Sequence, residues 1–108
     1  GGGVKQLGGA APAPRPDRAA SAVLHDEPNA RIVAFLLTPG QSVPPHTSTS
    51  TVIVHVVAGT GEFTGGEATL RASAGDTIVY APAELHGFVN TGDSDLHLLA
   101  LIAPRPGG

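Results

Sequence analysis

The chain has 108 residues, a formal net charge of −3 at pH 7 and only six lysine and arginine residues, scattered along the sequence. A face that binds phosphate backbones needs clustered positive charge, so we expect no nucleic-acid partner. No apolar run reaches the length of a membrane-spanning helix and no charged segment leads into an apolar one, which predicts a soluble, cytoplasmic protein without a membrane partner. Because cysteine is absent, any metal ion must be held by histidine, carboxylate or water.

Residues 1–20 are rich in glycine and proline, which predicts a flexible, extended N-terminal segment. Residues 21–104 alternate short apolar runs with glycine and proline turns, which predicts one all-β domain, and residues 105–108 form a tail. We expect a turn at 26–29, a hairpin tip at Gly65-Gly66, and strands at 21–24, 31–38, 52–57, 62–64, 67–72, 77–80, 85–90 and 96–102. About eight or nine antiparallel strands at a spacing of roughly ten residues are typical of a jelly-roll sandwich or barrel.

The polar and apolar patterns indicate which strand faces meet water. Residues 67–72 alternate, so one face of that strand is expected to be wet. Residues 52–57 and 98–102 do not alternate, so both faces of these strands are expected to be buried. The outer face can be covered only by the N-terminal segment or by a second subunit, and we therefore expect a homodimer.

Two segments each bring a histidine from a turn that proline stiffens onto a strand. Pro44 and Pro45 precede His46 in the first segment, and Pro82 precedes His86 in the second. Proline disfavours helix both at its own position and at the residue before it. We expect His46 and His86 to converge inside one β-barrel.

This arrangement resembles the cupins. The first cupin motif is Gly, five residues, His, one residue, His, three or four residues, Glu, six residues, Gly, and it is matched here at Gly40, His46 and Gly59. The second motif is Gly, five residues, Pro, one residue, Gly, two residues, His, three residues, Asn, and it is matched at Gly75, His86 and Asn90. The second His, the Glu, the Pro and the second Gly of the family are replaced by Ser48, Val52, Ala81 and Ala83. The motifs and the hairpin between them cover about half the chain.

The resemblance implies a cupin-type jelly-roll β-barrel with a small-molecule pocket, and it implies a divalent metal ion, such as iron, zinc, nickel, manganese or copper. His46 and His86 are the family ligand positions that keep a ligand side chain, whereas catalytic zinc and non-haem iron sites use three protein ligands. Glu84 leaves the same face of an extended segment as His86, which makes it the candidate third ligand or general base. His97 is a further candidate if its side chain points inward.

The side chains expected to face inward are apolar apart from one phenol: Phe35, Leu37, Val54, Val56, Tyr80 and Phe88. His55 is expected on the outer face. No lysine or arginine lies on the two motif strands, which favours a small, largely apolar ligand.

Three functions stay open on the sequence alone, and so does the question of whether the chain is an enzyme. The first is a divergent, dioxygenase-like metal enzyme that uses His46 and His86. The second is a metal-free module that binds or senses a small ligand. The third is a metal-free isomerase or cyclase in which a histidine transfers protons. No metal is required by the last two.

Overall fold

The computed structural model describes residues 3–106, which form nine β-strands and no helix. The strands are β1 (Ala20–Glu27), β2 (Ala30–Leu37), β3 (Ser42–His46), β4 (Thr51–Ala58), β5 (Thr60–Gly65), β6 (Ala68–Ser73), β7 (Thr77–Tyr80), β8 (His86–Val89) and β9 (Leu96–Ala103). In residues 3–106 no helix is long and apolar enough to cross a membrane.

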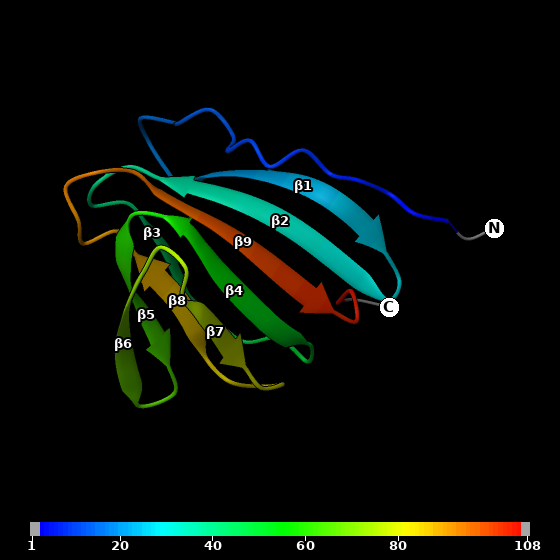
Figure 1. The fold of residues 1–108 in the computed structure, drawn as a ribbon. Coiled ribbons are helices and arrows are strands. Elements are labelled where there is room, and N and C mark those ends of the chain that lie inside the picture. Colours follow the sequence, from blue (N-terminus) through cyan, green and yellow to red (C-terminus); the bar gives the residue numbers. More distant parts are fainter. Residues whose placement is uncertain (1–2, 107–108) are drawn as a thin grey trace.

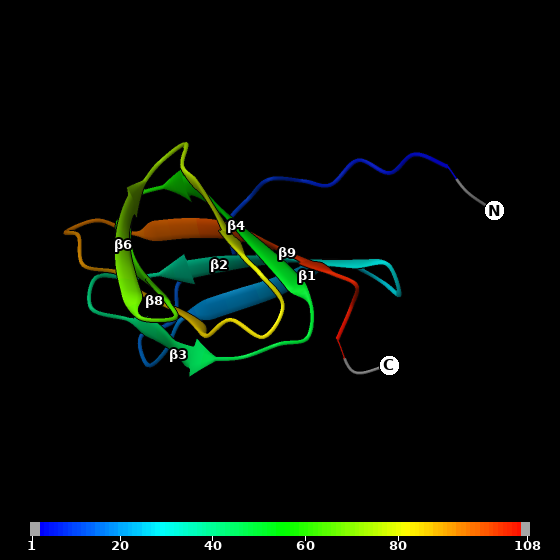
Figure 2. The ribbon, with the colours of Figure 1, turned by 90° about the horizontal axis from the view of Figure 1, so that it is seen from below.

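The strands form two sheets that face each other, with all neighbours antiparallel. One sheet has five strands in the order β1-β2-β9-β4-β7, and the other has four in the order β3-β8-β5-β6. Figure 1 shows the smaller sheet lying under one end of the larger one, and Figure 2 shows the pair from below. The predicted all-β jelly roll is therefore confirmed, and several of its neighbouring strands, such as β2 and β9, are distant in sequence.

The core fills the space between the sheets. Along β4, Val52, Val54 and Val56 are buried, because alternate side chains of a strand leave opposite faces. Every strand except β1 and β3 contributes to one buried cluster, formed by Leu37, Val52, Val54, Val56, Phe63, Ala72, Ile78, Tyr80, Phe88, Leu96, Leu98 and Ala100. On the other face of β4, His55 is partly exposed, as expected, and Val57 is 40% exposed. The expectation that both faces of this strand are buried thus does not hold within a single chain.

Three local features differ from the sequence-based expectation. β1 continues to Glu27, with a register shift between Val23 and His25, so the turn is confined to residues 28–29. The prolines before His46 lie within edge strand β3 rather than in a turn, because an edge strand tolerates residues that cannot donate to a ladder. The tip of the β5–β6 hairpin is Gly66-Glu67, one residue later than expected, since Gly65 pairs with Ala68 and Gly66 takes a φ of 57°.

The segment before β1 runs back along the outer side of the five-stranded sheet (Figures 1 and 2). It is anchored at two points: Gln41 Nε2 donates to the Arg15 carbonyl at 2.7 Å, and Lys5 Nζ donates to His25 Nδ1 at 2.8 Å. On this side of the sheet Ala34 and Leu36 are buried although they lie outside the core cluster, whereas Val79 is 64% exposed. The outer face of the five-stranded sheet is therefore only partly covered, and the N-terminal segment lies along it.

Candidate functional site

His46 and His86 lie side by side where β3 ends and β8 begins. They are register partners across the β3–β8 pair, and their ring centroids are 4.1 Å apart with an angle of 61° between the ring planes. His86 is buried, and His46 is exposed. The structure thus brings together the two histidines that the sequence singled out.

The close approach of the two strands depends on Gly87. A Cβ atom at this position would stand 2.8 Å from both the Cα and the N of Pro45, and 3.0 Å from the carbonyl oxygen of Val43. No side chain fits in that space, so β3 can lie this near to β8 only because the residue after His86 is glycine.

The backbone fixes the tautomer of both histidines. His46 Nδ1 lies 3.1 Å from the carbonyl oxygen of Pro44, and His86 Nδ1 lies 3.1 Å from that of Glu84. Since a carbonyl only accepts, each Nδ1 must carry the hydrogen and donate it. In a neutral ring the lone pair is then on Nε2, which becomes the nitrogen available to a molecule in the cavity.

The environment also keeps His86 neutral. Burial is the main cause that lowers the pKa of this imidazole below its usual value, and the nearby His46 lowers the pKa further. The hydrogen bond to the Glu84 carbonyl acts in the opposite direction. At neutral pH His86 is therefore an acceptor at Nε2.

Two adjoining cavities meet at the histidine pair. The inner chamber has a volume of about 50 Å³ and is lined mainly by apolar side chains: Phe35, Val43, His46, Val52, Val54, His86, Phe88, Ala100 and Ile102. The mouth has a volume of about 310 Å³ and is more polar, with Arg31, His46, Thr47, Ser48, Thr49, Val52, His86, Ile102 and Pro106 around it. A molecule that enters here meets polar groups first and apolar groups deeper in.

Ser48 and Val52 line the mouth beside the histidines. These are the positions at which the cupin motif has a second histidine and a glutamate. Two imidazoles, one hydroxyl and one apolar side chain therefore surround the place where the resemblance implies a metal ion.

Glu84 and His97 lie apart from the pair. The Glu84 side chain is exposed, and its Oε2 lies 3.1 Å from the point where a Cβ on Gly66 would stand, so the carboxylate lies near the tip of the β5–β6 hairpin. It lines a separate pocket with Tyr80, and the hydrogen bond between Glu84 and His86 is made by the Glu84 backbone carbonyl. His97 alternates with Leu96 and Leu98 of the core, so it lies on the opposite face of β9, where it is nevertheless buried.

Arg31 is a residue of the mouth that the sequence analysis missed. It lies on β2, four residues before Phe35 and so on the same face of the strand. The expected inward position of Phe35 was the signal that could have found it. Arg31 lies on neither of the two motif strands, which carry no lysine or arginine.

The side chains present do not make up a catalytic metal centre of the usual kind. Within residues 3–106 no group of three or more histidine, cysteine, aspartate or glutamate residues is placed to hold a metal ion. The pair supplies two nitrogen donors, one fewer than mononuclear zinc and non-haem iron centres require. The hydrogen bonds from Nδ1 to backbone carbonyls do match the support that ligand histidines commonly receive.

Comparison with known proteins identifies the family. Residues 33–102 match the family model described as a cupin domain, and this region includes both His46 and His86. No curated protein matches the chain.

Several solved structures share the fold. An RmlC-like cupin protein from Desulfovibrio desulfuricans is 27% identical, with a TM-score of 0.81 over 95% of this chain and 98% of that one. A predicted oxalate decarboxylase from Thermotoga maritima is 29% identical, with a TM-score of 0.77 over 81% of each chain. A protein from Thermus thermophilus is 23% identical, with a TM-score of 0.84 over 88% of this chain and 91% of that one, and it supports the fold alone. With its family match, its two motifs and its paired sheets, this chain belongs to the cupin superfamily.

Proposed function

We propose that the chain binds a small organic molecule in the cavity at His46 and His86 and that the imidazole pair is the polar anchor of that molecule. The observation that carries this proposal is the common tautomer of the two rings. Both Nδ1 atoms are occupied by backbone carbonyls, so both Nε2 atoms are left for a ligand at the boundary between the polar mouth and the apolar chamber. Ligand pockets commonly combine apolar walls with a few such placed polar groups.

The chemistry that fits this arrangement is hydrogen bonding or proton transfer at Nε2. A neutral imidazole can take a proton from a bound molecule and return it, and histidine is the side chain best suited to do so near neutral pH. Burial holds His86 in the accepting form, because it lowers the pKa of the ring. An isomerisation or cyclisation driven by proton transfer is the reaction class that this pair supports, and Glu84 takes no part in it.

A second candidate is a two-histidine site for a divalent ion such as copper, nickel, zinc, iron or manganese. It is favoured by the same hydrogen bonds from Nδ1, which orient imidazoles as metal ligands. It is weakened by Ser48 and Val52, which supply no strong ligand at the mouth. We rank it second for that reason.

One set of proteins tests both candidates. Parent protein, His46→Ala and His86→Ala are purified without a His tag or chelating column, together with His55→Ala, which removes a partly exposed histidine on the outer face of β4. Metal content is measured by elemental analysis, and binding by ligand-observed NMR with a library of small organic molecules.

The first candidate predicts fragments that bind the parent and His55→Ala but not the two cavity variants, with metal at trace level. About one equivalent of metal in the parent, lost in both cavity variants and retained in His55→Ala, favours the second candidate instead. Fragments that bind all four proteins alike contradict a ligand site at this pair.

A further inference from the structure

The mouth of the cavity has a cation and no anion. Arg31 is the charged residue among the side chains that line the mouth, and the others are hydroxyl, imidazole and apolar groups. An anionic group that entered this space would meet an opposite charge and no carboxylate of the described lining.

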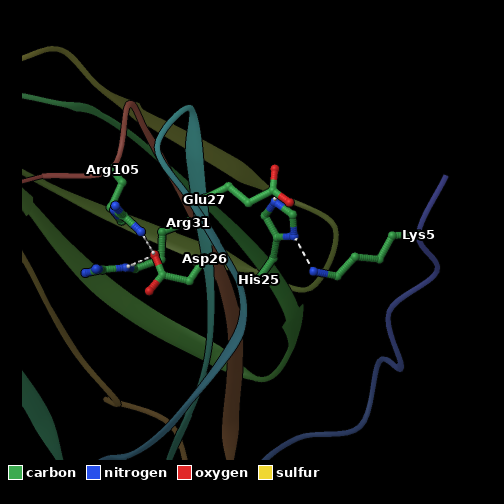
Figure 3. Close-up of polar contacts among 6 residues, drawn as sticks. All are labelled: Lys5, His25, Asp26, Glu27, Arg31 and Arg105. Atoms are coloured by element: carbon green, nitrogen blue, oxygen red, sulfur yellow. Dashed lines mark hydrogen bonds and ion pairs between the residues drawn. The ribbon is translucent and has the colours of Figure 1, made fainter. Parts of the chain in front are cut away.

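The Arg31 side chain is held in a defined orientation. Its Nε donates a hydrogen bond to Asp26 Oδ1 at 3.2 Å, and Arg105 Nη1 donates to the same oxygen at 3.3 Å (Figure 3). The hydrogen bond from Arg31 is the main cause that lowers the pKa of Asp26, so this carboxylate remains charged over a wide pH range. The orienting contact therefore persists under ordinary conditions.

The charges of this cluster do not cancel. Two guanidinium groups share one carboxylate, so Arg31, Arg105 and Asp26 together keep one positive charge. The Arg31 side chain is 31% exposed, which places it between full solvation and burial. An anion that binds in the mouth would neutralise this remaining positive charge.

The free edge of the guanidinium has the geometry of a carboxylate receptor. Because Nε is used by Asp26, the two terminal nitrogens remain, and Figure 3 shows them on the side away from Asp26. Within residues 3–106 no other side-chain hydrogen bond is made by Arg31. Paired terminal nitrogens of arginine bind a carboxylate through two parallel hydrogen bonds.

We infer that the ligand is a small monocarboxylate with a short apolar end and a hydrogen-bond donor between the two: its carboxylate pairs with Arg31 in the mouth, its donor faces the accepting Nε2 atoms of the histidine pair, and its apolar end enters the inner chamber. The chamber is small, with a volume of about 50 Å³, so it suits a short apolar end rather than a large ring system. This inference rests on the proposed binding of a small molecule at the histidine pair and adds the chemical class of that molecule. It also reconciles the apolar lining predicted from the sequence with the arginine that the fold brings to the mouth.

The test uses two probes of nearly the same shape, isobutyrate and its uncharged amide, isobutyramide. Each is titrated into the ¹⁵N-labelled full chain while the imidazole resonances of His46 and His86 are followed by NMR. The same titrations are made with Arg31→Met, which keeps the apolar stem. They are also made with Arg31→Lys, which keeps the charge but lacks the two terminal nitrogens that form parallel hydrogen bonds. Arg71→Met is the matched control, because Arg71 is exposed on β6.

We expect isobutyrate to shift the imidazole resonances and to bind about tenfold or more tightly than the amide, since a hydrogen bond to a charged group is worth that much. Arg31→Met should lose about the same factor for isobutyrate, Arg31→Lys should lie between, and Arg71→Met should match the parent. If Arg31→Met shows poor amide dispersion and is not folded, the Arg31→Lys titration decides alone.

Equal affinity for isobutyrate and isobutyramide, or unchanged isobutyrate binding in the Arg31 variants, would overturn the carboxylate inference while cavity binding stands. If neither probe moves either imidazole resonance at tens of millimolar, the inference is also overturned, and the failure then lies with cavity binding itself.

Discussion

The backbone of Pro45 lies so close to Gly87 that a Cβ on the glycine would stand 2.8 Å from the proline Cα. This contact joins edge strand β3 to β8 next to the histidine pair. We predict that Gly87→Ala lowers the free energy of unfolding by about 1–3 kcal/mol, because an added methyl group must push one strand away. The shift should also separate His46 from His86 and change the NMR resonances of both imidazoles.

Gly92→Ala is the matched control for this prediction. A Cβ at Gly92 meets its nearest neighbours at 3.5 Å, which is an ordinary contact distance. Urea unfolding of both variants gives the comparison. If Gly87→Ala is as stable as Gly92→Ala and leaves the imidazole resonances in place, the close approach of β3 does not hold the pair together.

The side chain of Asn90, just after β8, forms hydrogen bonds with the end of β2 and with the loop between β8 and β9. Its buried Nδ2 donates to the carbonyls of Leu37 and Ser94, both at 2.8 Å, and its Oδ1 accepts from the backbone N of Gly92 at 2.9 Å. In Asn90→Asp both donated hydrogen bonds are lost, so oxygen faces oxygen in a buried place. We predict a loss of about 3 kcal/mol in the free energy of unfolding, measured by urea denaturation near neutral pH.

The same change at Asn29, which is exposed in the β1–β2 turn, is the control and should leave stability nearly unchanged. A similar, small effect at both positions would mean that the Asn90 side chain does not clamp these carbonyls. The cupin motif includes this asparagine, and the contacts give it a structural role rather than a place in the cavity.

The fold and the histidine pair could be predicted from the sequence because both follow from local signals. Turn residues and β-branched runs mark the strands, and the motif spacing indicates which histidines meet. Strand β3 is harder to predict from the sequence, since its prolines disfavour a strand except at the edge of a sheet. Whether a strand is at an edge is decided by the topology of the whole chain.

The presence of a charged residue, Arg31, at the mouth of the cavity could not be predicted in the same way. Arg31 comes from β2, outside both motifs, and it reaches the cavity because β2 pairs with β9, which lies more than sixty residues later. His97 shows the same limit, because Leu96-His97-Leu98 is apolar on both sides and leaves the direction of the imidazole open. Only the placement of its neighbours in the core shows that it points to the outer face.

Tyr80 packs against His86 at 5.3 Å between ring centroids, and its buried hydroxyl has no hydrogen-bond partner among the described residues. Burial raises the pKa of this phenol to about 12, so the group is neutral. A buried hydroxyl without a partner costs free energy, so we predict that Tyr80→Phe is as stable as the parent or more stable by up to about 1 kcal/mol in urea unfolding.

Tyr80→Leu is the comparison, because it removes the ring as well. It should lose at least about 1 kcal/mol, since the large side chain fills the core. Clear destabilisation by Tyr80→Phe would show instead that the hydroxyl makes a hydrogen bond in solution.

His97 is 8% exposed on the outer face of β9, opposite Leu36 of β2, and among the described residues its Nε2 has no hydrogen-bond partner. Burial lowers the pKa of this imidazole below its usual value of 6.5. The folded state therefore resists protonation that the unfolded chain accepts. As pH falls below about 6.5 the unfolded state binds more protons, so the stability that the neutral ring contributes is lost, and it is fully present above that pH.

We predict that the free energy of unfolding of the parent decreases between about pH 8 and about pH 5, and that His97→Leu reduces this decrease. Some dependence should remain, because the pKa of His86 is also lowered, mainly by burial. Urea unfolding at both pH values measures the effect, and His55→Gln, at a partly exposed ring that contacts Thr77, should keep the full dependence of the parent. If His97→Leu and His55→Gln both keep the pH dependence of the parent, protonation of His97 on unfolding does not cause the loss of stability in acid.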